Sequence, residues 1–163
     1  MVDLPKVLII YDSKTGNTEK AAFKIAEGVK SVEGVKCEVK RVDDVDVQEL
    51  VKADGIIIGS PTYYGCMSWK IKQLIDHSVK VHGDLEGKVG AAFTSSGGTA
   101  SGAETTILSI LKVLLIHGMI VQGNPYNQHY GVAVVGAPNE KEERLCREFG
   151  VRVGRLVARL ANK

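Results

Sequence analysis

Three separated stretches of the chain combine hydroxyl groups, glycines and aromatic rings, which are residue types that bind phosphates and flat heterocycles. The first reads Ser13-Lys14-Thr15-Gly16-Asn17-Thr18. The second reads Pro61-Thr62-Tyr63-Tyr64-Gly65, and the third reads Ser95-Ser96-Gly97-Gly98-Thr99-Ala100. Each stretch comes at the end of an apolar run, so all three are predicted to be loops that leave the ends of strands.

The first loop is predicted to bind a phosphate group. It stands just before a helical pattern that begins at Asn17, and a helix N-terminus offers free backbone N–H groups and a partial positive charge. Gly16 lets the backbone wrap closely around an anion. The loop contains neither GK[ST] nor GxGxxG, so a triphosphate or dinucleotide loop of those types is not indicated. An ordinary helix N-cap built from the same residue types is the alternative.

The second and third loops are predicted to hold a flat ring. Tyr63 and Tyr64 offer two aromatic faces, and the glycines of the third loop let backbone groups approach a ring without obstruction. An isoalloxazine ring needs hydrogen bonds at its pyrimidine edge and apolar or aromatic cover elsewhere. A phosphate pocket beside such a slot predicts FMN as the cofactor. The alternatives are tyrosines that cover the end of the sheet and a flexible glycine-rich surface loop.

Strand and helix patterns alternate along the whole chain and must position these loops. The predicted strands cover 6–11, 35–42, 55–59 and 89–94, with 119–121 and 132–135 as two pieces of a fifth strand. The predicted helices cover 17–32, 47–53, 68–79, 103–117 and 141–160. This alternation predicts an α/β fold in three layers, a doubly wound parallel sheet of five strands in the flavodoxin-like order 2-1-3-4-5. In such sheets ligands bind beyond the carboxyl ends of the strands, where the three loops begin.

Composition is that of a globular protein. The 163 residues carry a net charge of +2, with 44% hydrophobic and 25% charged residues, so one domain over 1–163 is expected. The basic residues are dispersed, which gives no support for nucleic acid as a partner. No apolar run reaches the roughly 20 residues of a membrane span, and no signal peptide pattern begins the sequence. We therefore expect no membrane insertion and a cytoplasmic location.

The three cysteines, Cys37, Cys66 and Cys146, show no CxxC spacing and are odd in number. Neither a disulfide framework nor a metal site is expected from them. Cys66 directly follows the second loop, but no basic side chain accompanies it at a recognisable spacing, and its role is left open.

Longer motifs resemble a known family. The first loop resembles the flavodoxin phosphate signature. The combination of GSPTYYG, FTSSGGTASGAETT and Leu115-Ile116-His117-Gly118-Met119 resembles the WrbA-type NAD(P)H:quinone oxidoreductases over nearly the whole chain. The resemblance implies that the first loop binds the FMN phosphate, that the other two loops hold the flavin ring, and that His117 lies beside the flavin, commonly that of a neighbouring subunit. It also implies NADH or NADPH as donor, a quinone as acceptor, and a homodimer or homotetramer.

His117 has a structural alternative as well. A histidine that ends a helix just before a glycine is typical of a helix C-terminus, where it favours the helix dipole.

Two segments depart from the WrbA-type pattern. The segment 80–88 is shorter than the family's loop, which carries a tryptophan over the quinone and nicotinamide site, and the single tryptophan here is Trp69. The segment 122–131 is also shorter, and its Tyr126, His129 and Tyr130 either cover the ring instead or form a polar loop.

The expected function is that of an FMN oxidoreductase that passes electrons from NAD(P)H to a quinone or similar acceptor. The alternative is a flavodoxin that carries single electrons between proteins. Carriers of that kind tend to be strongly acidic, so a pI of about 8.4 favours the enzyme, whereas the shortened tryptophan loop favours the carrier. No catalytic side chain is predicted, because a flavin itself performs the redox chemistry.

Overall fold

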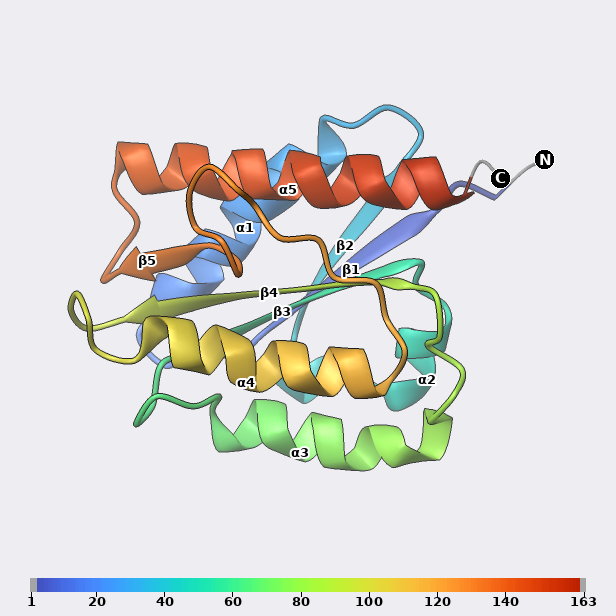
Figure 1. The fold of residues 1–163 in the computed structure, drawn as a ribbon, viewed down its shortest axis with the longest axis horizontal. Coiled ribbons are helices and arrows are strands. Elements are labelled where there is room, and N and C mark those ends of the chain that lie inside the picture. Colours follow the sequence, from blue (N-terminus) through green and yellow to red (C-terminus); the bar gives the residue numbers. More distant parts are fainter. Residues whose placement is uncertain (1–2, 162–163) are drawn as a thin grey trace.

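A computed structural model describes residues 3–161 and contains a five-stranded sheet between two layers of helices (Figure 1). The strands are β1 (Lys6–Tyr11), β2 (Lys36–Arg41), β3 (Gly55–Pro61), β4 (Val89–Ser96) and β5 (Ala133–Val135). They lie in the order β2-β1-β3-β4-β5, and every neighbouring pair is parallel. The predicted fold class and strand order are confirmed.

The helices cover both faces of this sheet. They are α1 (Asn17–Lys30), α2 (Val47–Val51), α3 (Trp69–His77), α4 (Ala103–Ile116) and α5 (Glu140–Ala161), with short 3-10 turns η1 (Val42–Asp44) and η2 (Ser78–Val81). In Figure 1, α1 and α5 lie on one side of the sheet and α3 and α4 on the other. None of the helices in residues 3–161 combines the length and apolar character needed to cross a membrane.

The apolar run of β1 explains why the sheet is covered on both faces. Successive strand side chains point to opposite faces. Val7 and Ile9 accordingly belong to the hydrophobic cluster under α1 and α5, whereas Leu8 and Ile10 belong to the cluster under α2, α3 and α4. All four side chains are fully buried, as is usual for a central strand of a parallel sheet.

The ends of β3, β4 and the fifth strand differ from the sequence prediction. β3 and β4 each run two residues further, because Ser60 and Pro61 stay paired with Thr94 and Ser95 in the parallel register and Ser96 pairs with Val135 of β5. The first predicted piece of the fifth strand is reduced to a single parallel bridge between Ile120 and Val89. The second piece is the three-residue β5. The excursion 122–131 separates the two pieces, as predicted.

Helices α1 and α5 approach each other closely through two glycines. A Cβ atom on Gly150 would lie 2.1 Å from the carbonyl oxygen of Ile25, and one on Gly28 would lie 2.0 Å from that of Arg147. Backbone atoms cannot move aside as a flexible side chain can. Glycine at these positions therefore permits the crossing of the two helices.

We expect Gly150→Ala to destabilise the protein, although alanine is favoured over glycine in a helix by up to about 1 kcal/mol. The added methyl group would force the helices apart, and overpacking of this kind costs about 1–3 kcal/mol. Urea unfolding followed by circular dichroism measures the change. Arg155→Ala, an exposed change on the same helix, is the control and should stay within about 0.5 kcal/mol of the wild type. A Gly150→Ala protein at least as stable as the wild type would contradict the packing argument.

Candidate functional site

The three predicted loops meet at one edge of the sheet, beyond the carboxyl ends of β1, β3 and β4. The Thr18 and Ser95 hydroxyl oxygens lie 2.7 Å apart, so a buried hydrogen bond joins the start of α1 to the end of β4. The backbone N–H of Thr62 donates to the carbonyl oxygen of Ser95 at 2.8 Å, which joins the second loop to the third. The structure thus brings together loops that lie about 80 residues apart in sequence.

The first loop leaves the N-terminus of α1 free to receive an anion. Gly16 is the N-cap residue, its φ of +92° lies in the left-handed region, and no side chain caps the helix. The predicted alternative of an ordinary side-chain cap is therefore wrong. Ser13 is used differently, because its hydroxyl oxygen accepts the N–H of Gly16 at 3.0 Å and closes the loop on itself. The loop geometry fits a phosphate, since backbone N–H groups and the positive end of the helix dipole face the same point.

The second loop is a tight turn that exposes its aromatic rings. Tyr63 and Cys66 exchange two backbone hydrogen bonds of 3.1 and 3.0 Å, and the two residues between them, Tyr64 and Gly65, both have positive φ. This is the backbone of a two-residue hairpin turn of type I′. The Tyr64 side chain is fully exposed and that of Tyr63 is 42% exposed. The tyrosines therefore do not seal the end of the sheet, and their rings are free to stack on a ligand.

The third loop is braced by its own side chains. Ser96 and Ser101 both donate from their hydroxyl groups to the carbonyl oxygen of Gly98, at 3.0 and 2.5 Å. A Cβ on Gly97 or Gly98 would meet no atom within 4 Å, so open space borders this backbone. Just beyond the loop, the N-cap residue of α4 touches the second loop, since a Cβ on Gly102 would lie 2.8 Å from the Cα of Gly65. A braced backbone next to open space and exposed aromatic rings fits a flat heterocycle.

His117 lies outside this arrangement within one chain. It is the C-cap residue of α4, whose N-terminus adjoins the third loop, and a 14-residue helix is about 21 Å long. Its side chain is only 7% exposed. Gly118 follows with a φ of +76°, which is the helix-end arrangement given above as the alternative. Contact between His117 and the flavin of another subunit stays a prediction.

The hydrogen bonds around His117 fix its protonation. The Ser78 hydroxyl donates to the carbonyl oxygen of Ile75 at 2.6 Å, so its oxygen must accept the proton of His117 Nε2 at 2.8 Å. Nδ1 then carries the lone pair, and it is buried without a hydrogen-bond partner among the described residues. Burial lowers the pKa of His117, and the neighbouring His82, whose ring centroid is 5.5 Å away, lowers it further. A charged imidazolium is disfavoured at this helix end.

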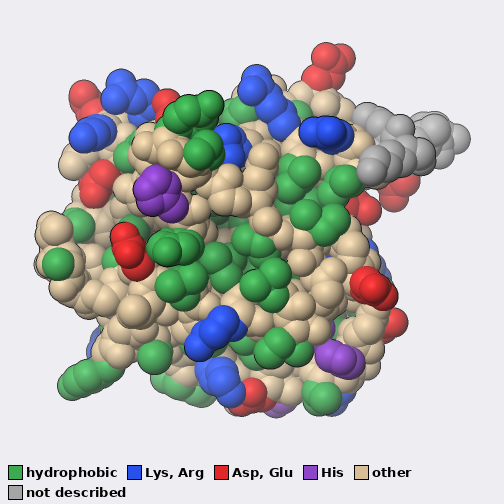
Figure 2. Space-filling model, in the orientation of Figure 1, with side chains coloured by type: hydrophobic (Ala, Val, Ile, Leu, Met, Phe, Trp, Pro, Cys, Tyr) green, Lys and Arg blue, Asp and Glu red, His purple; other side chains and the backbone are tan. Residues whose placement is uncertain are grey.

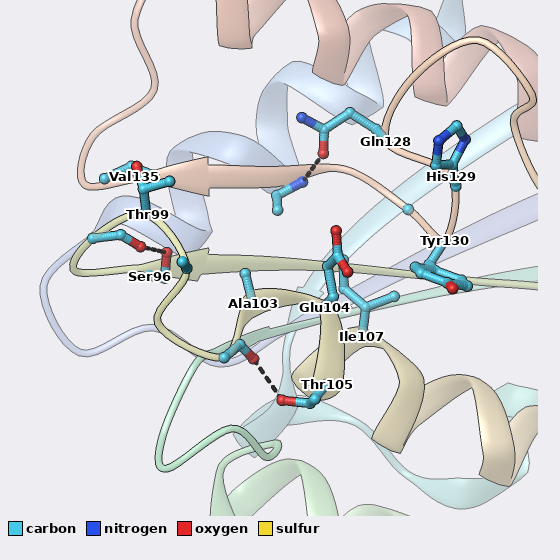
Figure 3. Close-up of a pocket in the computed structure, with 15 residues that line it drawn as sticks. Ser96, Thr99, Ala103, Glu104, Thr105, Ile107, Gln128, His129, Tyr130 and Val135 are labelled. Atoms are coloured by element: carbon cyan, nitrogen blue, oxygen red, sulfur yellow. Dashed lines mark hydrogen bonds between the residues drawn. The ribbon is translucent and has the colours of Figure 1, made fainter.

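A pocket of about 570 Å³ lies beside the third loop, between the start of α4 and the segment that leads into β5 (Figure 3). His129 and Tyr130 line it, as do Glu104 and Gln128, two residues that the sequence did not single out. Figure 3 shows Glu104 projecting from the first turn of α4 toward Gln128. On the face shown in Figure 2, hydrophobic side chains gather over α4 and the segment before β5. Tyr126 is exposed and lies outside the pocket lining.

The structure also places Arg41 at the first loop, which the sequence analysis missed. Its Nη2 atom donates to the carbonyl oxygen of Ser13 at 2.5 Å. The residue ends β2, a strand that contributes none of the three predicted loops. Arg41 could have been found from the sequence, because all strands of a parallel sheet end at the same edge, and the end of the second predicted strand therefore lies near the loop after the first.

The lowered pKa of His117 gives stability a definite pH dependence. The unfolded chain binds a proton near the ordinary value of 6.5, whereas the folded protein binds it only at lower pH. Stability from this residue is therefore complete above pH 6.5 and is lost as the pH falls below that value, by up to about 1.4 kcal/mol per pH unit. His117→Gln should flatten that part of the profile in urea unfolding between pH 7.5 and 5. His129→Gln, at an exposed histidine, is the control, and equal slopes in the wild type and His117→Gln would contradict the assignment.

Comparison with known proteins agrees with the fold. The family model described as flavodoxin matches residues 9–106. A flavodoxin from Aquifex aeolicus is 41% identical over 161 residues, covering 94% of this chain and 87% of that protein. An NAD(P)H dehydrogenase (quinone) from Archaeoglobus fulgidus is 35% identical over 191 residues, covering 96% of this chain and all of that protein.

A solved structure described as a flavodoxin, WrbA-like protein, from Agrobacterium tumefaciens shares the fold. Its TM-score is 0.82 at 23% identity, over 95% of this chain and 98% of that one. The resemblance expected from the motifs, to flavodoxins and to NAD(P)H quinone oxidoreductases, is confirmed. The chain is a flavodoxin-fold flavoprotein and belongs to the flavodoxin family.

Proposed function

We propose that this protein binds FMN at the carboxyl edge of its sheet and transfers electrons through it. The observation that carries the proposal is the joining of all three loops at Ser95, which hydrogen-bonds Thr18 through its side chain and Thr62 through its backbone. The candidate phosphate site and the candidate ring site are thereby held at a fixed distance and orientation from each other. A ligand that carries both a phosphate and a flat ring requires such an arrangement. Bound FMN would supply the redox chemistry.

The chain's own residues would bind and orient the cofactor. Backbone N–H groups at the start of α1 would receive the phosphate, with Gly16 keeping the approach clear. The exposed rings of Tyr63 and Tyr64 would stack on the flavin. The backbone of the third loop would meet the pyrimidine edge, where Gly97 and Gly98 leave room.

We infer that the electrons pass between partner proteins, so that the protein acts as a carrier. The alignment with the Archaeoglobus dehydrogenase extends over 191 residues, more than the 163 of this chain, so that relative has segments which this chain lacks. The alignment with the Aquifex flavodoxin extends over 161 residues. The short segments 80–88 and 122–131 agree with this difference. The segments that this chain lacks relative to the dehydrogenase thus favour the carrier, whereas the pI of about 8.4 favours the reductase.

A reductase that takes electrons from NAD(P)H and delivers them to a quinone is the second candidate. The pocket beside the third loop favours it, because 570 Å³ lies within the usual size range for a small-molecule site. Its lining includes the ring of Tyr130 and the side chain of Ile107, which suit an aromatic ligand.

FMN binding is tested by Thr15→Glu, which places a carboxylate in the first loop. Thr15 is exposed, so the change should leave the fold intact. Repulsion of the phosphate should weaken FMN binding roughly 10- to 100-fold, measured by quenching of flavin fluorescence. Gln48→Glu, an exposed change on α2 that adds the same charge, should bind FMN like the wild type. A wild-type protein that takes up no FMN would end the proposal.

Rapid mixing with NADH or NADPH separates the two candidate functions. For a carrier we expect the visible absorbance of bound FMN to persist for minutes with either nucleotide, and to be lost promptly with a chemical reductant. Loss of absorbance within seconds of adding a nucleotide, followed by recovery when a quinone is added, would instead establish the reductase. Free FMN mixed with the same nucleotide, without protein, provides the baseline.

A further inference from the structure

Arg41 reaches the first loop from the neighbouring strand. In the parallel register of the sheet it stands opposite Tyr11, the last residue of β1, so both residues end at the edge where the first loop begins. The guanidinium group donates through Nη2 to the carbonyl oxygen of Ser13 at 2.5 Å. Ser13 in turn accepts the N–H of Gly16, so the arginine holds the residue that closes the loop.

Negative charges surround the same loop. Asp12 stands just before it and is 8% exposed, and Glu19 lies in the first turn of α1. The nearest carboxylate oxygens of both residues lie 4.0 Å from nitrogens of Arg41. A carboxylate at this end of a helix competes with a bound anion for the positive end of the dipole. Without Arg41, two carboxylates would face an incoming phosphate from nearby.

Other contacts hold the guanidinium in place. Its carbon atom lies 6.0 Å from the centre of the Tyr11 ring, which is within range of a cation–π interaction. The Tyr11 hydroxyl donates to Glu19 at 2.6 Å, and Arg41 Nε donates to Asp43 at 3.1 Å. Burial and the Glu19 carboxylate raise the pKa of Tyr11 to about 12, so the phenol stays a donor at neutral pH. Arginine is always charged, so Arg41 offsets the negative charges of Asp12 and Glu19 at every pH in the physiological range.

We propose that Arg41 is the positioning residue for the phosphate of FMN: it fixes the first loop through Ser13 and offsets the charges of Asp12 and Glu19. The inference rests on the proposed binding of FMN. It makes selectivity for the phosphorylated flavin depend on a residue of β2, although β2 lies at the edge of the sheet and contributes no loop to the site.

The test compares FMN with riboflavin, which has the same ring and no phosphate. In Arg41→Gln the dissociation constant for FMN should rise about tenfold, whereas that for riboflavin should change less than twofold. Lys40→Gln is the matched control, because it removes the same charge from the adjacent residue of β2. Lys40 pairs with Glu38 and Glu49, away from the loop, so both constants should keep their wild-type values.

Two further measurements separate a specific role from a general loss of structure. Raising the salt concentration should shrink the difference in FMN affinity between Arg41→Gln and the wild type, because salt screens exposed charges. Glu19→Gln should have the opposite effect and tighten FMN binding severalfold, since it removes one of the opposing charges. This second variant keeps the inference testable even if Arg41→Gln folds poorly.

The outcomes distinguish this inference from the proposed function. If the wild type binds FMN and Arg41→Gln binds it equally well, Arg41 has no positioning role. Equal weakening of FMN and riboflavin would likewise overturn the inference, because it would show damage to the whole site. If the wild type binds neither flavin, the proposed function itself fails.

Discussion

The hydrogen bonds of Ser95 join the three loops at the carboxyl edge of the sheet to one another. Its side chain meets Thr18 at the start of α1, and its carbonyl oxygen receives the N–H of Thr62 at the end of β3. Because every strand runs in the same direction, the loops after β1, β3 and β4 leave from one edge, and Ser95 in β4 can reach both the loop after the neighbouring β3 and the helix that follows β1. The two hydrogen bonds of Ser95 therefore help to set how the three loops lie relative to one another.

Much of this arrangement could be predicted because it follows from local patterns. The buried run of β1 and the alternation of strands with helices specify a parallel doubly wound sheet. The loops were visible because glycines, hydroxyl residues and tyrosines cluster after apolar runs. The extensions of β3 and β4 were not visible, since serine and threonine at a strand end give no apolar signal although their backbones stay paired.

The features that were missed depend on distant contacts. Arg41 meets Ser13 across 28 residues of sequence, and nothing in the composition of β2 indicates that partner. The hydrogen-bond partner of His117 is Ser78, which is contributed by η2, 39 residues earlier in the chain. The pocket beside the third loop needs α4 and the excursion before β5 together. Each is a consequence of tertiary packing, which a pattern within one segment does not contain.

The glycine crossing between α1 and α5 has a consequence for the first loop at the other end of α1. At this crossing the backbones of α1 and α5 are in direct contact, with no compressible side chain between them. Helix α1 is therefore held firmly against α5. The free backbone N–H groups at the start of α1 keep a fixed position and direction only if the helix cannot slide along its own axis. Helix α5, which contributes no residue to the candidate site, thereby helps to hold the start of α1 and the first loop in one position.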